Sequence, residues 1–292
     1  KYFDLPKWAT FWKKGGMGVN LYAYLWEALL FFYLLKRYKR NHFDIAQRVT
    51  FVAYKFPSFI WYFSKKFIFG PIAGGERYPI SFLRVFSFKG KIKEITRMLL
   101  QRLSLLDPFI LLTFHKASKI IAVTNDTKSI LPRFARVKTI VEPAISIDVN
   151  DFTHYKQKEY KKSKRLKILY VGNILELKGI KLVMMSLKRF SNKKYEFNII
   201  GSGPDKHIFD KYAKENNINV NFIGQVERSL LSEYYLTNHV FVFPSLHDSG
   251  GMVILEAKAH GLPVIVSAFG GPKMFVDTAK GDIIISEKTV NL

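Results

Sequence analysis

The chain of 292 residues contains no cysteine. This excludes a disulfide scaffold, an iron–sulfur cluster, a thiolate zinc site and a cysteine nucleophile. Asp-x-Asp, G-x-S-x-G and P-loop patterns are also absent, and the seven histidines show no spacing typical of metal ligands. We therefore expect no metal and no cofactor, and the sequence disfavours serine-hydrolase and P-loop chemistry.

A hydrophobic run long enough to cross a bilayer is missing as well. The longest apolar run, residues 21–35, is interrupted by Glu27 and is shorter than the ~20 residues that a span requires. No secretory signal pattern follows Lys1. The run ends in the basic segment 36–40, which is compatible with a core helix that has a solvated end or with an aromatic helix lying on a membrane surface.

Acidic residues are scarce in the first part of the chain. The whole sequence has 46 Lys and Arg against 23 Asp and Glu; residues 1–165 hold 31 against 11, a balance of +20, and residues 166–292 hold 15 against 12, a balance of +3. Such asymmetry indicates an anionic partner for the basic part: a membrane surface, a phosphorylated lipid or a nucleic acid. Because the aromatic side chains of residues 21–35 lie in an apolar helical segment, base stacking is disfavoured and we expect no nucleic acid.

Strand-like and helix-like segments alternate from residue 166 onward, which predicts an α/β fold with a doubly wound parallel sheet. We expect two Rossmann-like domains that face a cleft: residues 1–150, strongly basic, and residues 166–292, joined by a lysine-rich linker at 151–165. Few strands are visible before residue 50, and the chain stops soon after 283–285. We therefore expect a fragment that lacks its first strand and its C-terminal end. The expected strands are 50–53, 67–69, 119–123, 138–141, 166–171, 197–200, 220–223, 240–243 and 263–267.

A glycine-containing loop follows the expected strand 166–171. Gly172 and Asn173 open it, and Lys178 lies just before a helical stretch that begins near residue 180. Glycines allow the backbone to approach a phosphate, a helix N-terminus offers unpaired N–H groups, and the lysine adds positive charge. The loop is thus a candidate phosphate site, although an ordinary strand-to-helix turn with an exposed lysine would read the same way.

A second candidate segment follows the strand 240–243. Asp248 lies beyond the strand, and Glu256 stands eight residues later among apolar helix positions, where an unpaired carboxylate would be costly to bury. We expect Glu256 to be hydrogen-bonded, for example to a ligand hydroxyl, whereas Asp248 could equally cap the helix. The residues between them that complete this candidate site are Ser249, Gly250, Gly251 and Met252.

Two further glycine turns carry weaker signals. The turn that contains Gly201 and Gly203 lacks the third glycine of a dinucleotide fingerprint, so it does not indicate an NAD site. The loop of Gly74, Gly75 and Glu76 follows the strand 67–69 and could contact an acceptor, or it could be a tight turn with a surface acid.

Taken in order, these segments resemble glycosyltransferase family 4, whose members are retaining enzymes of the GT-B type. The segments 171–179, 200–204, 222–225 and 243–265 resemble the family's donor-binding domain, and 67–79 is similar to a loop of a bacterial subgroup that builds surface polysaccharides. The resemblance covers most of the chain and is strongest from residue 166 onward.

The resemblance implies a role for each candidate residue. Glu256 would hold the nucleotide ribose, Asp248 would lie near the donor sugar in place of the usual glutamate, and Lys178 would neutralise the diphosphate. Gly250 and Gly251 would offer backbone N–H groups to the sugar or the diphosphate, and together with Gly172, Asn173, Gly201, Gly203, Ser249 and Met252 they form the expected donor site. Two departures stand out. Asn173 replaces a common arginine, and Gln47 and Arg48 stand where related chains have a histidine.

The implied activity is metal-independent transfer of a sugar, with retention, from a nucleotide-sugar donor to a lipid-linked or saccharide acceptor in cell-surface glycan synthesis. Gly74, Gly75 and Glu76 would lie on the acceptor side. The basic first domain would face an anionic membrane, which predicts a cytoplasmic protein held peripherally at the inner face of the cell membrane. Two alternatives are a GT-B epimerase that acts on a nucleotide sugar and a non-catalytic basic module that binds a membrane or nucleic acid.

Overall fold

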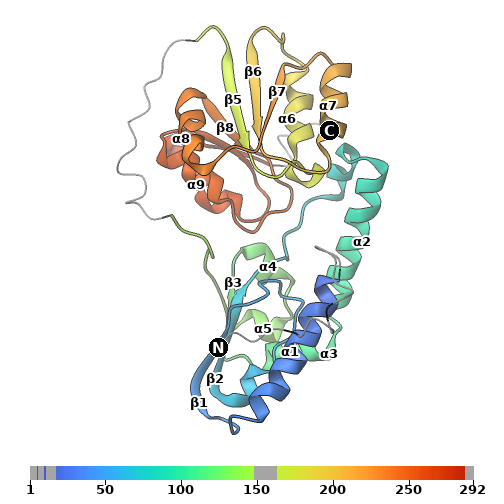
Figure 1. The fold of residues 1–292 in the computed structure, drawn as a ribbon, viewed down its shortest axis with the longest axis vertical. Helices are drawn as coiled ribbons and strands as arrows, with labels where there is room; N and C mark the ends of the chain where they lie inside the picture. The colour runs from blue at the N-terminus through green and yellow to red at the C-terminus, as the bar shows by residue number, and fades with distance from the viewer. Residues whose placement is uncertain (1–4, 6–9, 11–17, 148–162, 287–292) are drawn as a thin grey trace. The chain divides into compact units, whose positions relative to one another are not determined.

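The computed structural model describes residue 5, residue 10 and residues 18–147 and 163–286. These residues divide into two compact units (Figure 1). The first is drawn from residues 1–75 and 95–144, and the second from residues 76–94 and 145–292. The segment 76–94, which the sequence division at residue 150 assigns to the first domain, therefore packs with the second unit. Most of the expected linker 151–165 lies outside the described residues.

The first unit contains a four-stranded parallel sheet with the strand order β1-β2-β3-β4. Its described strands follow the order of the chain without a reversal. The strands are β1 (Phe43–Arg48), β2 (Ser64–Ile72), β3 (Lys119–Ala122) and β4 (Thr139–Val141). The helices are α1 (Val19–Leu35), η2 (Ile60–Phe63), α3 (Pro108–Lys116), α4 (Asn125–Ile130) and α5 (Arg133–Arg136), and α2 (Phe88–Ser104) begins in the second unit and continues into the first.

The second unit contains a six-stranded parallel sheet with the order β10-β9-β8-β5-β6-β7. The strand order reverses at β5: β6 and β7 lie on one side of it, and β8, β9 and β10 lie on the other. The sheet is therefore doubly wound. Helices α6 and α7 cover one face, and α8 and α9 cover the other (Figure 1). The strands are β5 (Leu166–Val171), β6 (Tyr195–Ile200), β7 (Val220–Gly224), β8 (Val240–Phe243), β9 (Val264–Ser267) and β10 (Ile283–Ile285). The helices are η3 (Ile80–Val85), η5 (Glu176–Lys178), α6 (Ile180–Leu187), α7 (Lys206–Glu215), α8 (Arg228–Thr237), α9 (Met252–Ala259), η6 (Pro272–Phe275) and η7 (Thr278–Lys280).

Each unit has its own hydrophobic core. In the second unit the inward-facing residues of the strands pack with Met184 of α6, Phe209 of α7 and Tyr235 of α8. In the first unit Phe67 and Phe69 of β2 pack with Phe114 of α3 and the residues around it. Burial of such side chains on both faces of a parallel sheet explains why most of these strands are nearly continuous apolar runs in the sequence.

The two expected α/β regions with parallel sheets are confirmed, but one strand of the first unit was wrongly placed. Residues 50–53 form a loop whose only ladder contact in the described structure is the single bridge between Ala53 and Ala73. The strand lies earlier, at β1, which is an edge strand with mostly exposed side chains and so lacks an apolar run. Across the described residues, no helix combines the length and the apolar character that a membrane span requires.

Candidate functional site

The loops that carry the first two candidate residues leave the sheet at its reversal point. β5 ends at Val171 and leads into the loop that contains Lys178, and β8 ends at Phe243 and leads to Asp248. β5 and β8 are neighbours in the sheet, and each contributes its carboxyl end there. In doubly wound sheets ligands bind at the carboxyl ends of the strands, at the point where the strand order reverses. The topology therefore brings these two loops together at the position expected for a ligand.

Lys178 and Asp248 form an ion pair, with Nζ 2.5 Å from Oδ2. Both side chains are largely but not fully buried, at 17% and 19% exposure. The second oxygen of Asp248 accepts a hydrogen bond from the backbone N–H of Gly250 at 3.2 Å. Asp248 thus orders the backbone that leads into α9 and also pairs with a lysine, but it does not cap the helix, whose N-cap is Gly251 without a side-chain hydrogen bond; the interpretation of Asp248 as a helix cap is wrong.

Tyr170, in β5, holds the beginning of the loop that follows this strand. Its buried hydroxyl donates to the carbonyl oxygen of Asn173 at 2.9 Å, and its ring stacks on Phe243. Burial, with the nearby charge of Asp248, raises the pKa of Tyr170, so this hydroxyl stays protonated and remains a donor. The Asn173 side chain itself is exposed.

Gly201 and Gly203 lie against this same loop. A Cβ on Gly201 would lie 2.0 Å from the carbonyl oxygen of Gly172, and one on Gly203 would lie 2.1 Å from that of Ile174. Gly201 also has a positive φ of 133°, which L side chains rarely adopt. Close approach of the β5 and β6 loops accounts for both glycines, and it brings Gly172, Asn173, Gly201 and Gly203 together at one edge of the sheet.

Helix α9 begins at Met252, directly after Gly251, and no side chain caps its first turn in the described structure. Met252 is 41% exposed. An uncapped helix N-terminus offers backbone N–H groups and a positive dipole end to an anion. Ser249, Gly250 and Gly251 lead directly into this helix N-terminus.

Glu256 lies about one turn further along α9, four residues after Met252, and is nearly buried. Its Oε2 accepts a hydrogen bond from the hydroxyl of Tyr235 at 3.1 Å, and its Oε1 lies 3.7 Å from a guanidinium nitrogen of Arg228. Burial and the Glu256 charge raise the pKa of Tyr235, which keeps its hydroxyl a donor. The expectation that Glu256 is hydrogen-bonded is therefore met by protein groups. Sequence reasoning missed both partners because neither stands at a recognisable spacing from the acid.

The acceptor-side loop is divided between the two units. Gly74 and Gly75 belong to the first, where the N–H of Gly75 donates to the hydroxyl of Thr127 and a Cβ on Gly75 would lie 2.6 Å from the Thr127 Cα. Glu76 belongs to the second unit and is 1% exposed. The prediction of a surface acid in a tight turn is therefore wrong for Glu76.

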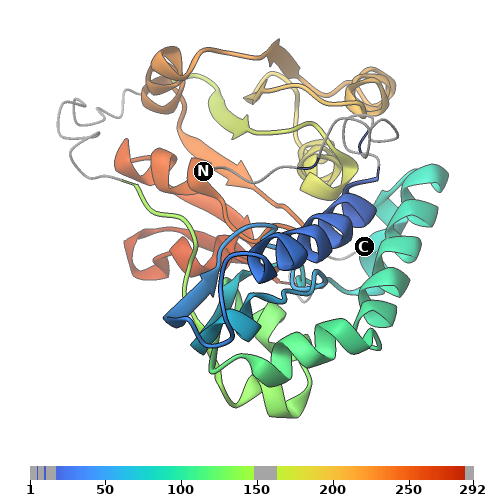
Figure 2. The ribbon, with the colours of Figure 1, turned by 60° about the horizontal axis from the view of Figure 1, so that its bottom comes forward.

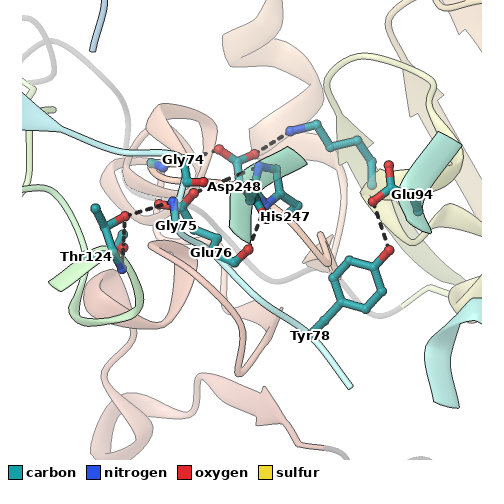
Figure 3. Close-up of polar contacts among 12 residues, drawn as sticks. Gly74, Gly75, Glu76, Tyr78, Glu94, Thr124, His247 and Asp248 are labelled. Atoms are coloured by element: carbon teal, nitrogen blue, oxygen red, sulfur yellow. Dashed lines mark hydrogen bonds and ion pairs between the residues drawn. The ribbon is translucent and has the colours of Figure 1, made fainter. Parts of the chain in front are cut away.

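Glu76 is joined to His247, the residue that precedes Asp248. The Nδ1 of His247 lies 3.1 Å from the backbone carbonyl oxygen of Glu76, and its Nε2 lies 3.9 Å from the Glu76 carboxylate (Figure 3). His247 was not selected from the sequence because the histidines were searched only for metal-ligand spacing. Its position immediately before a candidate acid was the signal that could have found it.

Glu176 is a second residue that sequence reasoning missed. Its carboxylate accepts hydrogen bonds from both the backbone N–H and the hydroxyl of Ser87, at 2.5 and 2.8 Å, and its own N–H donates to Asp205. Glu176 stands two residues before Lys178. The segment 76–94 is therefore attached to the second unit at the same loop that carries the candidate phosphate-binding lysine.

No group of three or more potential metal ligands occurs among the residues that the structure describes. The polar groups of the site are instead a lysine, two carboxylates and a set of backbone N–H groups. Such a set can bind an anionic ligand and can accept hydrogen bonds from hydroxyl groups.

The second half of the chain is similar in sequence to known proteins. Residues 151–291 match the family model of glycosyl transferases group 1. A 41.2 kDa protein in the cps region of Klebsiella pneumoniae is 31% identical over 150 residues, covering 50% of this chain and 40% of that protein. Alpha-monoglucosyldiacylglycerol synthase of Acholeplasma laidlawii is 33% identical over 93 residues, covering 31% and 23%. The chain thus matches less than half the length of either relative.

The fold is that of GT-B glycosyltransferases. The crystal structure of WaaG, a glycosyltransferase involved in lipopolysaccharide biosynthesis, superposes with a TM-score of 0.53 at 16% sequence identity. The match covers 94% of this chain and 71% of WaaG. At 16% identity this similarity concerns the fold.

Proposed function

We propose that the protein is a retaining glycosyltransferase of family 4, in its bacterial surface-polysaccharide subgroup, and that it uses a nucleotide-sugar donor. The observation that carries the proposal is the pair of Lys178 and Asp248 at the carboxyl ends of β5 and β8, beside the uncapped N-terminus of α9. The similarity to group 1 glycosyl transferases over residues 151–291 supports it.

In the proposed reaction the bond between the donor sugar and the diphosphate breaks, and a bond forms from the same sugar carbon to an acceptor oxygen. The acceptor proton passes to the departing diphosphate. Negative charge grows on the diphosphate as it leaves, so Lys178 and the N–H groups at Gly250, Gly251 and Met252 would stabilise the transition state without a metal ion. Attack on the face that the diphosphate leaves would give retention.

Glu256 would accept hydrogen bonds from the nucleotide ribose, and Asp248 would lie near the donor sugar. When a diphosphate binds, Lys178 would exchange part of its interaction with Asp248 for the new anion. The acceptor would be a lipid-linked or saccharide hydroxyl, and the synthase from Acholeplasma laidlawii, whose name describes a glycosylated diacylglycerol, is in keeping with a lipid. We place the protein peripherally at an anionic membrane surface, on the cytoplasmic side.

The first test is calorimetric titration of the purified chain with UDP, GDP and ADP in the presence of EDTA. We expect one nucleotide to bind selectively, and Lys178→Ala to weaken it by about tenfold or more, since a charge-assisted contact contributes roughly 1.5–3 kcal/mol. The matched control is Lys181→Ala, three residues later in α6, whose ammonium lies over the Tyr212 ring. The donor site would be misassigned if the folded wild-type chain bound none of the three nucleotides. It would also be misassigned if Lys178→Ala and Lys181→Ala bound the nucleotide with equal affinity.

A further inference from the structure

Residues 76–94 form a segment of the second unit that the chain inserts between two parts of the first. Near the ends of this segment, the hydroxyl of Tyr78 donates to the carboxylate of Glu94 at 2.9 Å, and both residues are buried (Figure 3). The segment also contains the beginning of α2, the teal helix in Figures 1 and 2. A buried hydrogen bond thus joins the two ends of residues 76–94, which we call the inserted segment.

The inserted segment holds the turn that carries Lys178. Ser87 donates two hydrogen bonds to the carboxylate of Glu176, from its backbone N–H at 2.5 Å and from its hydroxyl at 2.8 Å. Glu176 is 7% exposed and stands two residues before Lys178, in the same short helix η5. Gly90 allows the close approach, because a Cβ there would lie 2.1 Å from a carboxylate oxygen of Glu176. Since a buried carboxylate is costly without donors, Ser87 fixes the position of Glu176 and with it the turn.

Two further contacts fix the η5 turn. The N–H of Glu176 donates to the carboxylate of Asp205 at 2.9 Å, in the loop that follows β6. The carbonyl oxygen of Leu177 accepts a hydrogen bond from the N–H of Leu246 at 3.0 Å, in the loop that follows β8. The backbone at Lys178 is therefore placed by three neighbouring parts of the second unit, and the inserted segment is one of them.

The beginning of the inserted segment lies against the loop of Asp248. The backbone carbonyl oxygen of Glu76 can only accept a hydrogen bond, so Nδ1 of His247, 3.1 Å away, carries a proton and donates it (Figure 3). A Cβ on Gly270 would lie 2.1 Å from the carbonyl oxygen of Asp248 and 3.2 Å from the Cγ of Glu76. The inserted segment thus contacts both loops whose ends bring Lys178 and Asp248 together.

We propose that Ser87 and Glu176 are positioning residues of the donor site, and that the inserted segment holds the η5 turn where Lys178 can meet a diphosphate. Ser87 acts on Glu176, and Glu176 sets the turn, so that the effect of both reaches the ligand through Lys178. The inference rests on the proposed function, because that function assigns the diphosphate to Lys178. It adds a residue outside the donor loops on which the strength of donor binding depends.

Two simpler roles for these residues predict different outcomes. The hydroxyl of Ser87 also accepts a hydrogen bond from the N–H of Gly90 at 3.1 Å, in the first turn of α2. If it only capped this helix, its removal would lower stability without any effect that depends on Lys178. If Glu176 acted only through its charge, it would repel an anion, and removing it would strengthen nucleotide binding. Loss of a positioning contact would weaken nucleotide binding instead.

The test compares three variants by calorimetric titration of the full chain with UDP, GDP and ADP. Glu176→Ala should weaken the preferred nucleotide by about tenfold, since Lys178 is no longer held in place. Glu176→Gln keeps an oxygen for the Ser87 N–H and gains an amide that can donate to the Ser87 hydroxyl, so it should bind within about twofold of wild type. Glu215→Ala, the matched control, removes an exposed acid at the end of α7 and should leave binding unchanged.

A double-mutant cycle shows whether the effect passes through Lys178. In the Lys178→Ala background, Glu176→Ala should weaken the nucleotide further by less than about twofold, because the group that it positions is already absent. An equal loss in both backgrounds would mean a general structural effect and would overturn the proposal. Tighter binding by Glu176→Ala alone would overturn it too, because the charge of Glu176 would then outweigh its contact with Ser87.

Hydrogen exchange of the backbone amides at 175–179, measured without nucleotide, tests the contact independently of the donor site. Glu176→Ala and Ser87→Ala should both speed exchange there, since the turn loses one of its three contacts. Unchanged exchange in both variants overturns the proposal. If the wild type binds no nucleotide while exchange responds to the variants, the proposed function fails and the hold of the inserted segment on the turn stands.

Discussion

The carboxylate of Glu256 is shared between a buried and an exposed partner. Tyr235 is almost completely buried and donates to Oε2, whereas Arg228 reaches Oε1 from an exposed position, at 75% exposure of its side chain. The first contact supports the fold of the second unit, because an unpaired buried hydroxyl is costly. The second lies at the surface, where a ligand hydroxyl could approach the same oxygen.

Two substitutions separate these contributions. Glu256→Gln keeps an oxygen for Tyr235 and should change stability by less than about 1 kcal/mol, but it should weaken the preferred nucleotide by about tenfold through loss of a charged acceptor. Glu256→Ala should in addition lower the free energy of unfolding by about 1–3 kcal/mol, because Tyr235 is left unpaired.

The measurement is titration of wild type and Glu256→Gln with the nucleotide and with its 2′,3′-dideoxy analogue. If Glu256 binds the ribose, the variant loses affinity for the nucleotide and hardly any for the analogue. An equal loss for both ligands would contradict a ribose contact.

At this scale the sequence predicted which residues would be polar and close to strand ends, but not what they touch. Lys178, Asp248 and Glu256 could be selected because a charge near a glycine loop or inside an apolar helix is conspicuous. The ion pair between Lys178 and Asp248 joins residues 70 positions apart, and the contact from His247 to Glu76 spans 171 positions. Such pairings are set by tertiary packing, which local patterns do not contain.

Among the secondary-structure elements, the strand ends decide where chemistry can occur. The second sheet places β5 and β8 side by side, so their following loops meet although about 70 residues separate them. These strands were predictable because both faces of the sheet are covered and their sequences are apolar except for Lys167 of β5. β1 was not, because an exposed edge strand with the sequence FDIAQR follows no apolar pattern.

At the edge of the six-stranded sheet formed by β10, one buried acid holds three elements together. Asp282 precedes β10 and accepts hydrogen bonds from the backbone N–H groups of Val264 and Asp277, at 3.1 and 2.9 Å, and it pairs with Lys258 of α9. Burial alone would raise the pKa of Asp282, but the hydrogen bonds and the Lys258 charge outweigh it and hold the pKa below its ordinary value. One carboxylate therefore joins α9, β9 and β10.

We expect Asp282→Asn to lower the free energy of unfolding by about 1.5–3 kcal/mol at pH 7, since hydrogen bonds to a charged group are lost. Because the folded-state pKa is depressed, the stabilisation is present above the ordinary carboxyl pKa of about 4 and is lost as the pH falls through the folded-state value. The difference between wild type and variant should thus shrink below about pH 4.

Urea unfolding at several pH values measures this difference. The matched control is Asp44→Asn, whose carboxylate also pairs with a lysine, Lys65 at 2.8 Å, but is exposed to solvent. This exposed pair should contribute no measurable stability at any pH. A pH-independent loss in the Asp282 variant would mean that shape, not charge, explains its effect.

At the scale of the whole molecule, each unit has its own hydrophobic core, and the first unit also buries an ion pair. The first unit buries the ion pair of Arg48 and Glu27, with Nε 3.1 Å from Oε1 and both side chains at most 3% exposed. The remaining nitrogens of Arg48 have no hydrogen-bond partner in the described structure. The guanidinium lies near the faces of Phe51 and Phe69, which provide a cation–π environment.

Removing one partner of this pair should affect the first unit alone. Arg48→Met leaves Glu27 as an uncompensated buried charge and should cost about 3–5 kcal/mol, whereas Glu27→Gln/Arg48→Met should recover most of that loss. All four tryptophans, at positions 8, 12, 26 and 61, lie in the first 75 residues. Tryptophan fluorescence therefore reports on the first unit, and nucleotide binding reports on the second.

The experiment follows both signals through urea unfolding of the full chain. For Arg48→Met we expect the fluorescence transition to move to lower urea while nucleotide binding is lost at the same urea concentration as in wild type. The double variant should restore the fluorescence midpoint. If the two signals instead shift together, the cores unfold as one cooperative system, and the stability of the donor site then depends on a charge pair in the other unit.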